Sequence, residues 1–176
     1  DDISLSSLAG YYALDSSNAL AFNFTYFELG DISYTDQDGF FAGKYSPYEL
    51  YFKVGYKRRF NRSISAGLAL KYIRSDIAPP SAQNTQTVNT FAVDFGFSYD
   101  NTYRLHNNSF LNTAAGIAIS NFGPKYTYTP QVDEKLFVPT KLALGLYINP
   151  DINIKDVVRL NIELGYQAEK YLVPTP

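Results

Sequence analysis

Alternation of apolar and polar side chains with a period of two residues runs through most of this chain, and it constrains the fold more than any other feature. Between residues 48 and 60 the even positions are apolar or aromatic except for Arg58, whereas the odd positions mostly carry charges and a glycine. This period is that of a β-strand with one apolar face. It recurs at residues 91–99 and 158–166, and with lower contrast at residues 5–14, 20–26, 64–72, 111–119 and 142–148. The chain therefore predicts an all-β, antiparallel fold of about eight strands without a helix.

The connections between these segments alternate between short polar turns and long loops. Turn-forming residues gather at residues 15–18, 61–62, 106–108 and 149–151, and the long connections are residues 28–47, 78–89 and 121–139. Short turns at one edge of a sheet and long loops at the other are typical of an outer-membrane barrel. Strands of about 10–12 residues also suit a tilted membrane crossing.

The chemistry of the two faces favours a transmembrane β-barrel. Glycine and alanine fall mostly on the polar face, which a soluble core would fill with larger side chains. Tyrosines occur near the predicted strand ends, where a membrane barrel carries aromatic girdles: Tyr26, Tyr48, Tyr72, Tyr99 and Tyr166. A soluble eight-stranded ligand-binding barrel stays open as an alternative, because the alternation fits either orientation of the faces.

The number of predicted strands bears on how the chain fits a complete barrel. An even number of strands places both termini on one side, and here that is the side of the long loops. Bacterial barrels normally keep both termini on the side of the short turns. We therefore expect residues 1–176 to form an internal portion of a single outer-membrane β-barrel domain.

Composition argues against several classes of function. The net charge of −2 does not suit a nucleic-acid binder, and the absence of Cys excludes disulfides and thiolate chemistry. The single histidine, His106, lies in an Asn-rich turn without the partners of a catalytic triad. Asp36, Asp38 and Gly39 form only a fragment of a calcium loop, so a polar turn is favoured. We expect no enzyme, no catalytic residue, no cofactor and no metal.

Charged side chains on the polar face would line the lumen of such a barrel. They could form a conduction path, but their mixed signs favour pairing across the lumen over a selective pore. They are Glu49, Lys53, Lys57, Arg59, Lys71, Asp94, Lys141, Arg159 and Glu163.

Aromatic residues in the long connections are candidates for contacts with a partner protein, because exposed aromatic side chains are costly without a partner. A second interpretation, which stays open, is that they fold back over the mouth of the barrel. They are Phe40, Phe41, Tyr45, Tyr126, Tyr128 and Phe137.

Two segments have a specific sequence: residues 119–125, which contain Asn121-Phe122-Gly123-Pro124-Lys125, and residues 172–176, Leu172-Val173-Pro174-Thr175-Pro176. Six further segments accompany them: residues 55–60, 65–68, 71–77, 91–94, 99–101 and 137–140. In this order along nearly the whole chain, these segments resemble the PorV-type outer-membrane barrels of the Bacteroidetes type IX secretion system.

The resemblance implies a FadL-like barrel of about fourteen strands in the bacterial outer membrane, in contact with its lipid. Members of this family bind the C-terminal signal domain of secreted cargo proteins. They take the cargo from the translocon barrel and pass it to a sortase that attaches it to the cell surface, without catalysing a reaction themselves. A FadL-like transporter of small hydrophobic molecules is the alternative that this architecture permits.

Overall fold

The computed structural model describes residues 3–36, 38–77, 85–131, 135–154 and 158–172, and their regular structure is entirely β. The thirteen strands are β1 (Ser4–Ala13), β2 (Asn18–Glu28), β3 (Ile32–Thr35), β4 (Phe41–Tyr45), β5 (Tyr48–Arg59), β6 (Ile64–Asp76), β7 (Val88–Arg104), β8 (Phe110–Phe122), β9 (Lys125–Tyr126), β10 (Leu136–Phe137), β11 (Lys141–Ile154), β12 (Val158–Asn161) and β13 (Leu164–Tyr171). Within these residues, no helix is long and apolar enough to cross a membrane.

The long strands form one antiparallel sheet in the order β1-β2-β5-β6-β7-β8-β11, with β12 and β13 both paired to β11. This confirms the predicted all-β antiparallel fold, and the eight predicted segments all lie in strands of this sheet. The two smaller sheets are the hairpins β3–β4 and β9–β10. They lie inside the connections 28–47 and 121–139, so these long segments contain structure that alternation did not reveal.

The last pair of strands corrects one predicted turn. Residues 149–151 do not turn, because β11 runs through them to Ile154. The register continues unchanged from β12 to β13, and Ile162 N donates to Pro150 O (3.1 Å) at the break. Pro150 has no backbone N–H, so it cannot donate the second hydrogen bond of its pair with Ile162. The ladder of hydrogen bonds is therefore interrupted at this position, although the chain does not turn. Proline was therefore a misleading turn signal.

The remaining short turns lie where the sequence predicts them. Asp15 accepts hydrogen bonds from the side-chain amide of Asn18 and from the backbone N–H groups of Ser17 (2.7 Å) and Asn18 (2.9 Å), and these bonds, the amide bond first, lower the pKa of the Asp15 carboxyl. Asn107 and Asn108 both have positive φ, 55° and 56°, as a two-residue hairpin turn with matching twist requires.

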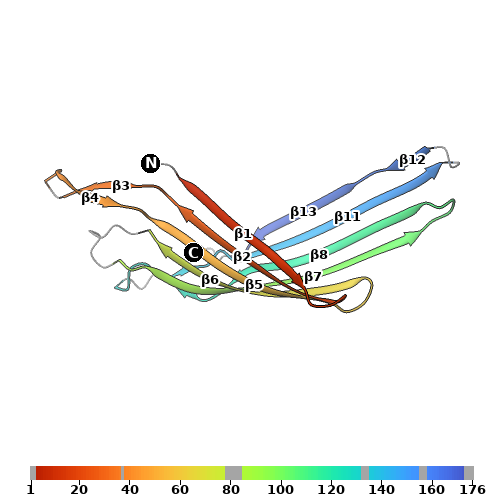
Figure 1. The fold of residues 1–176 in the computed structure, drawn as a ribbon, viewed down its shortest axis with the longest axis horizontal. Helices are drawn as coiled ribbons and strands as arrows, with labels where there is room; N and C mark the ends of the chain where they lie inside the picture. The colour runs from red at the N-terminus through yellow and green to blue at the C-terminus, as the bar shows by residue number, and fades with distance from the viewer. Residues whose placement is uncertain (1–2, 37, 78–84, 132–134, 155–157, 173–176) are drawn as a thin grey trace.

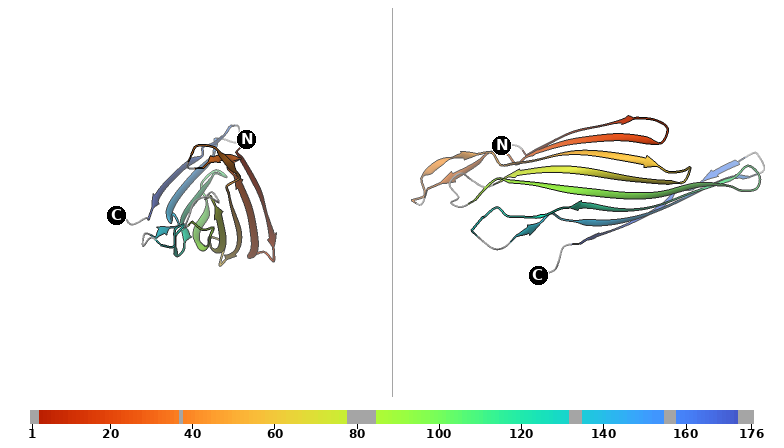
Figure 2. Two further views of the ribbon diagram at one scale, coloured as in Figure 1. Left: turned by 90° about the vertical axis from the view of Figure 1, so that its left-hand side faces the viewer. Right: turned by 90° about the horizontal axis from the view of Figure 1, so that it is seen from below.

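The sheet is strongly curved and open. Figure 1 shows β1 and β2 sloping opposite to β11 and β13, and Figure 2 shows a trough with β1 and β13 on its two sides. Within the described residues β1 pairs only with β2, so the sheet does not close on itself. Ser4 and Tyr171, the outer ends of β1 and β13, lie at the same end of the sheet as the two hairpins.

The apolar side chains of the sheet are mostly exposed. Among the described residues the buried hydrophobic side chains are those of Val88, Ala92 and Val138, whereas leucines and phenylalanines at the centre of the strands, such as Leu70 (56% exposed) and Phe52 (45% exposed), face outward. A sheet that exposes this much apolar surface needs a further apolar phase or protein against that face.

Candidate functional site

The polar side chains gather on the concave face of the trough. A cavity of about 500 Å³ on this face is lined by residues from Tyr11 of β1 to Ser120 of β8, so side chains from widely separated strands converge there. Its wall includes the small residues Gly55, Ala69 and Gly96, which leave the space open.

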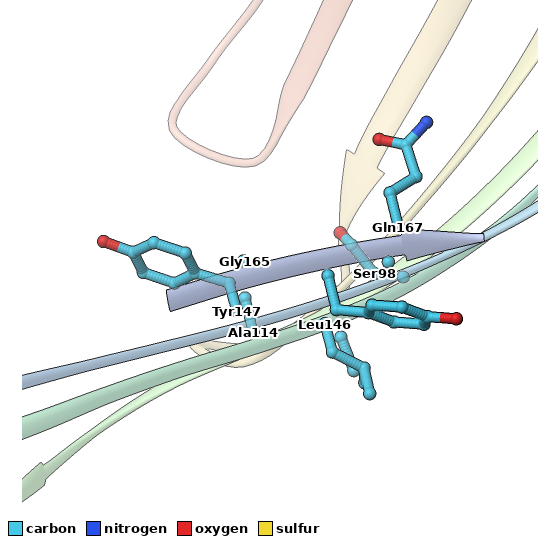
Figure 3. A pocket seen from close by; sticks show the side chains of 10 residues that line it. Ser98, Ala114, Leu146, Tyr147, Gly165 and Gln167 are labelled. Carbon is cyan, nitrogen blue, oxygen red and sulfur yellow. The ribbon is translucent and has the colours of Figure 1, made fainter. Parts of the chain in front are cut away.

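A second hollow of about 440 Å³ lies against β7, β8, β11 and β13. In Figure 3 Gln167 and Leu146 point to opposite sides of the sheet, which shows the separation of polar and apolar faces directly. Ala114 and Gly165 contribute no bulk to this hollow, because the polar face carries small residues here as predicted.

Asp94 of β7 is the centre of the charge cluster on the concave face. Its carboxylate lies 3.4 Å from Lys53 Nζ of β5 and 3.6 Å from Lys71 Nζ of β6, so the contact with Lys53 reaches across one intervening strand. The side chains of Lys71 and Asp94 are only 12% and 16% exposed, whereas that of Lys53 is 36% exposed. Lys53 also donates a hydrogen bond to Asp94 Oδ2, whereas the better shielded Lys71 donates to the side-chain oxygen of Asn121.

The same carboxylate stabilises an irregularity in β8. Asp94 lies opposite two residues, Ser120 and Asn121, because the register shifts between Val93 and Phe95. Asn121 takes a left-handed conformation (φ 60°), and its N–H donates to Asp94 Oδ1 (2.8 Å), while its side-chain oxygen accepts from Lys71. Such a β-bulge redirects the strand that carries it. Here it directs the chain toward the β9–β10 hairpin.

Gly123 continues this redirection two residues later. A Cβ at this position would overlap the carbonyl oxygen of Phe91 and touch Ala92. Only glycine allows the chain to pass so close to β7. The segment 119–125 thus combines a bulge, a close approach and a proline, which is a structural reason for its specific sequence.

The other predicted lumen charges are distributed along the same face. Lys141 Nζ lies 2.9 Å from Glu169, Arg159 Nε lies 2.7 Å from Asp151, and Glu49 accepts from Ser75 Oγ (2.7 Å). Lys57, Arg59 and Glu163 are exposed. Five of the nine predicted residues therefore form ion pairs with described residues, while the prediction that these charges line a closed lumen stays a prediction.

The six predicted loop aromatics separate into two groups. Phe40 (73% exposed) and Phe41 (67% exposed) lie at the tip of the β3–β4 hairpin, which projects from the end of the sheet in Figure 1. Tyr45 lies in the same hairpin, with its ring 6.1 Å from that of Tyr34. This group presents its phenylalanine rings to the surroundings.

Tyr126 and Tyr128 lie instead against the concave face. Their rings meet edge to face at 5.7 Å, and Tyr128 OH donates to the buried Ser75 Oγ (2.8 Å). Burial of Tyr126, then its proximity to Tyr128 and Glu49, raises the pKa of its phenol.

Phe137 completes the six, with Lys125 Nζ 4.4 Å above its ring. The β9–β10 hairpin lies over the concave face of the sheet, and a cavity of about 370 Å³ lies between this hairpin and strands β5, β6 and β7. For Tyr126 and Tyr128, folding back over the sheet is the arrangement observed.

The structure also shows the surroundings of two weaker sequence motifs, the turn at Asp36 and the single histidine, His106. Asp36 Oδ1 accepts from the backbone N–H groups of Asp38 (3.0 Å) and Phe40 (2.9 Å), which is the polar turn that the sequence favours over calcium. His106 supplies a backbone carbonyl to the N–H of Ser109 (3.2 Å). Across the described residues there is no group of three or more His, Cys, Asp or Glu side chains that could hold a metal ion.

Sequence reasoning missed several contacts of the candidate site on the concave face. Ser75 and Tyr128 link the β9–β10 hairpin to the wall, and Asp151 and Glu169 provide counter-charges. Glu169 lies on the alternation that begins at residue 158 and could have been found by extending it. The contact between Ser75 and Tyr128 spans 53 residues and has no local signal.

These features define an all-β protein with a curved antiparallel sheet that separates an apolar face from a polar one, as the wall of a barrel does. The family model of type IX secretion system protein PorV matches residues 1–176, so the chain belongs to that family and is a component of the type IX secretion system, associated with the cell envelope. This confirms the resemblance noted in the sequence. Comparison with curated proteins finds no match.

Proposed function

We propose that this protein is an outer-membrane barrel that binds exported cargo of the type IX system through its C-terminal signal domain. It accepts cargo from the translocon barrel and passes it to the surface attachment machinery, including a sortase. Membership of the PorV family supports the secretion role, and the exposed apolar face supports a lipid environment. The protein acts as a binding component rather than as an enzyme.

In this proposal residues 1–176 are an internal portion of a single barrel domain. Among the described residues, the outer edges of β1 and β13 have no partner strand, and a membrane does not tolerate unpaired backbone groups. Further strands, to a total of about fourteen, would satisfy them in a closed barrel.

The observation that carries cargo binding is the β3–β4 hairpin. Phe40 and Phe41 are the most exposed phenylalanines of the described residues, and the β3–β4 hairpin to which they belong projects beyond the sheet at the end where the long connections lie (Figure 1). Exposed aromatic rings at a protruding tip are the usual energetic centres of protein interfaces. Tyr126 and Tyr128, by contrast, already have partners on the wall.

Two alternatives receive less support from the geometry. A soluble eight-stranded barrel needs a closed sheet with an enclosed apolar face, whereas the described strands form an open trough with that face outward. A transporter of hydrophobic molecules needs an apolar interior, whereas the concave face carries the cluster of Lys53, Lys71 and Asp94.

The first experiment is fractionation of the native full-length protein. We expect it in the outer membrane, dependent on detergent for extraction, with a gel mobility that changes on heating. Recovery as a detergent-free monomer would overturn the membrane assignment.

The second experiment measures cargo binding to the purified full-length protein, with a reporter fused to the C-terminal signal domain of a secreted cargo protein. Phe40→Ser with Phe41→Ser should weaken binding at least ten-fold, because a central interface aromatic contributes about 2 kcal/mol or more. Phe60→Ser, an exposed phenylalanine at the opposite end of the strands, is the matched control. Equal binding by both variants would contradict the role of the β3–β4 hairpin.

A further inference from the structure

Four cations lie within six residues at the short-turn end of β5: Lys57, Arg58, Arg59 and Arg62. All four are exposed, and none forms an ion pair with a described residue. Asp15 interacts with Arg58 only through space, because its carboxylate is occupied by hydrogen bonds from its own turn. The cluster therefore has positive charge that the described residues do not neutralise.

The backbone that carries these cations is well ordered by hydrogen bonds. Asn61 Oδ1 accepts from Ser63 N and Ile64 N at 2.8 Å each, and Phe60 N donates to Ile64 O (2.8 Å). Arg59 N donates to Ser17 O of the neighbouring turn (2.7 Å). A preorganised turn lowers the entropic cost of binding a ligand.

The position of Arg58 relative to the apolar face indicates what this ligand is. In β5 the outward-facing residues run from Tyr48, which stacks on Tyr26 at one end, to Arg58 at the other. Ten residue steps at about 3.3 Å give about 33 Å along the strand, and a tilt of roughly 40° reduces this to about 25 Å. That is about the height of the apolar band of a membrane barrel. Arg58 thus lies at the level of the lipid headgroups.

Phe60 strengthens this placement. It follows Arg58 on the same face and is 60% exposed, and the Arg58 guanidinium lies 5.7 Å from its ring centroid. An aromatic ring beside a cation is the combination that anchors proteins at a membrane interface. A protein partner would not require these two residues to continue the apolar face.

We infer that Arg58, Phe60 and Arg62 of this segment bind anionic phospholipids in the leaflet on the short-turn side, whereas Lys57 and Arg59 lie on the polar face of β5. Arg58 and Arg62 donate to the phosphate oxygens, and Phe60 inserts beside the upper part of the acyl chains. This inference rests on the proposed function, because it requires the apolar face to meet lipid. It adds a lipid preference that membership of the family does not imply.

The test uses the full-length protein in detergent micelles, titrated with phosphatidylglycerol and, separately, with phosphatidylcholine, with bound lipid counted by native mass spectrometry. The variant is Arg58→Gln with Arg62→Gln. The matched control is Lys44→Gln with Lys135→Gln, which removes the same charge from the hairpins at the other end. Since each cation strengthens binding to an anionic surface roughly five-fold, the variant should bind phosphatidylglycerol about 25-fold more weakly, and the control should match the wild type.

Each result is decisive. Equal retention of both lipids by the wild type, or an equal effect of the variant and the control, would overturn the inference while leaving the proposed function intact. Failure of the wild-type protein to fractionate with the outer membrane would overturn the proposed function, and the inference with it. Binding of the wild type to a second protein that competes with phosphatidylglycerol at Arg58 would assign the cluster to a protein interface instead.

Discussion

The β3–β4 and β9–β10 hairpins lie at the same end of the sheet and are both rich in aromatic residues, yet they have opposite positions. The β3–β4 hairpin continues outward from β2 and β5, with its base closed by the bond from Leu29 N to Pro47 O (3.0 Å). The β9–β10 hairpin is directed inward by the bulge at Asn121, and Tyr128 bonds to the wall. Aromatic content alone therefore does not decide whether a loop projects outward or folds back over the sheet. The path of the backbone before the loop decides it.

The strongest way to disrupt this difference is to block the inward path of the β9–β10 hairpin. Gly123→Val should displace the hairpin and lower the free energy of unfolding by about 3 kcal/mol, because its Cβ would overlap Phe91 O and neither backbone can easily move. Protease accessibility of residues 125–137 and chemical unfolding measure both effects. Gly145→Ala is the control, since a Cβ there has open space. Equal behaviour of the two variants would show that the close approach does not hold the hairpin.

The charge cluster below the hairpin should give the next largest effect. Asp94→Asn removes the counter-charge of Lys53 and Lys71 but keeps one oxygen that can accept from Asn121 N, so we expect a cost of about 1–3 kcal/mol in the free energy of unfolding. Lys53→Gln should cost less, since Lys53 is the more exposed of the two lysines. A larger loss in Lys53→Gln than in Asp94→Asn, measured by denaturant unfolding, would show that the Asp94 carboxylate is not the centre of the cluster.

Removal of a single hydroxyl should change the position of one hairpin only. Tyr128→Phe deletes the bond to Ser75 and should destabilise the folded-back position by about 1 kcal/mol. Hydrogen exchange in residues 125–131 should then become about five-fold faster. Tyr45→Phe in the β3–β4 hairpin serves as the control. Hydrogen exchange of the β3–β4 hairpin should be the same in this variant as in the wild type. Equal protection from exchange in Tyr128→Phe and the wild type would show that this hydrogen bond does not stabilise the folded-back position.

The smallest expected effect is a response to alkaline pH. The pKa of Tyr126 is raised above its ordinary value of 10.0, first by burial. The folded-back position therefore keeps its full stability below about pH 10 and loses it as pH rises through the raised pKa, because the ionised phenol favours the exposed state. Tyrosinate absorbance and protease accessibility should change together above that pH, and Tyr126→Phe should remove the dependence in accessibility. Release of the hairpin below pH 9 would contradict this sign.

Much of the sheet could be predicted from the sequence, because strand alternation is a local signal. The two faces of β5, the small residues of the concave wall and the turns at Asp15 and Asn107 follow from side chains within a few positions of one another. Pro150 shows the limit of this approach, since proline is typical of turns but also fits where a ladder can lose one bond. The short hairpins were missed because strands of two to five residues leave no readable period.

The candidate site was predicted as residue types but not as partners. The alternation placed Lys53, Lys71 and Asp94 on one face, yet only the register and the bulge show that a single carboxylate serves both lysines. For the loop aromatics, Tyr126 and Tyr128 are folded back over the sheet, whereas contact of Phe40 and Phe41 with a partner stays a prediction.

The sequence by itself determined the strands, their apolar and polar faces and the family, because alternation and segment order are properties of neighbouring residues. Only the tertiary structure decided which loop folds inward, which charges meet and how far the sheet curves. These depend on a bulge at Asn121 and on contacts between residues as distant in sequence as Ser75 and Tyr128. Such contacts form only when strands that are far apart in the chain are brought side by side, so no local pattern can encode them.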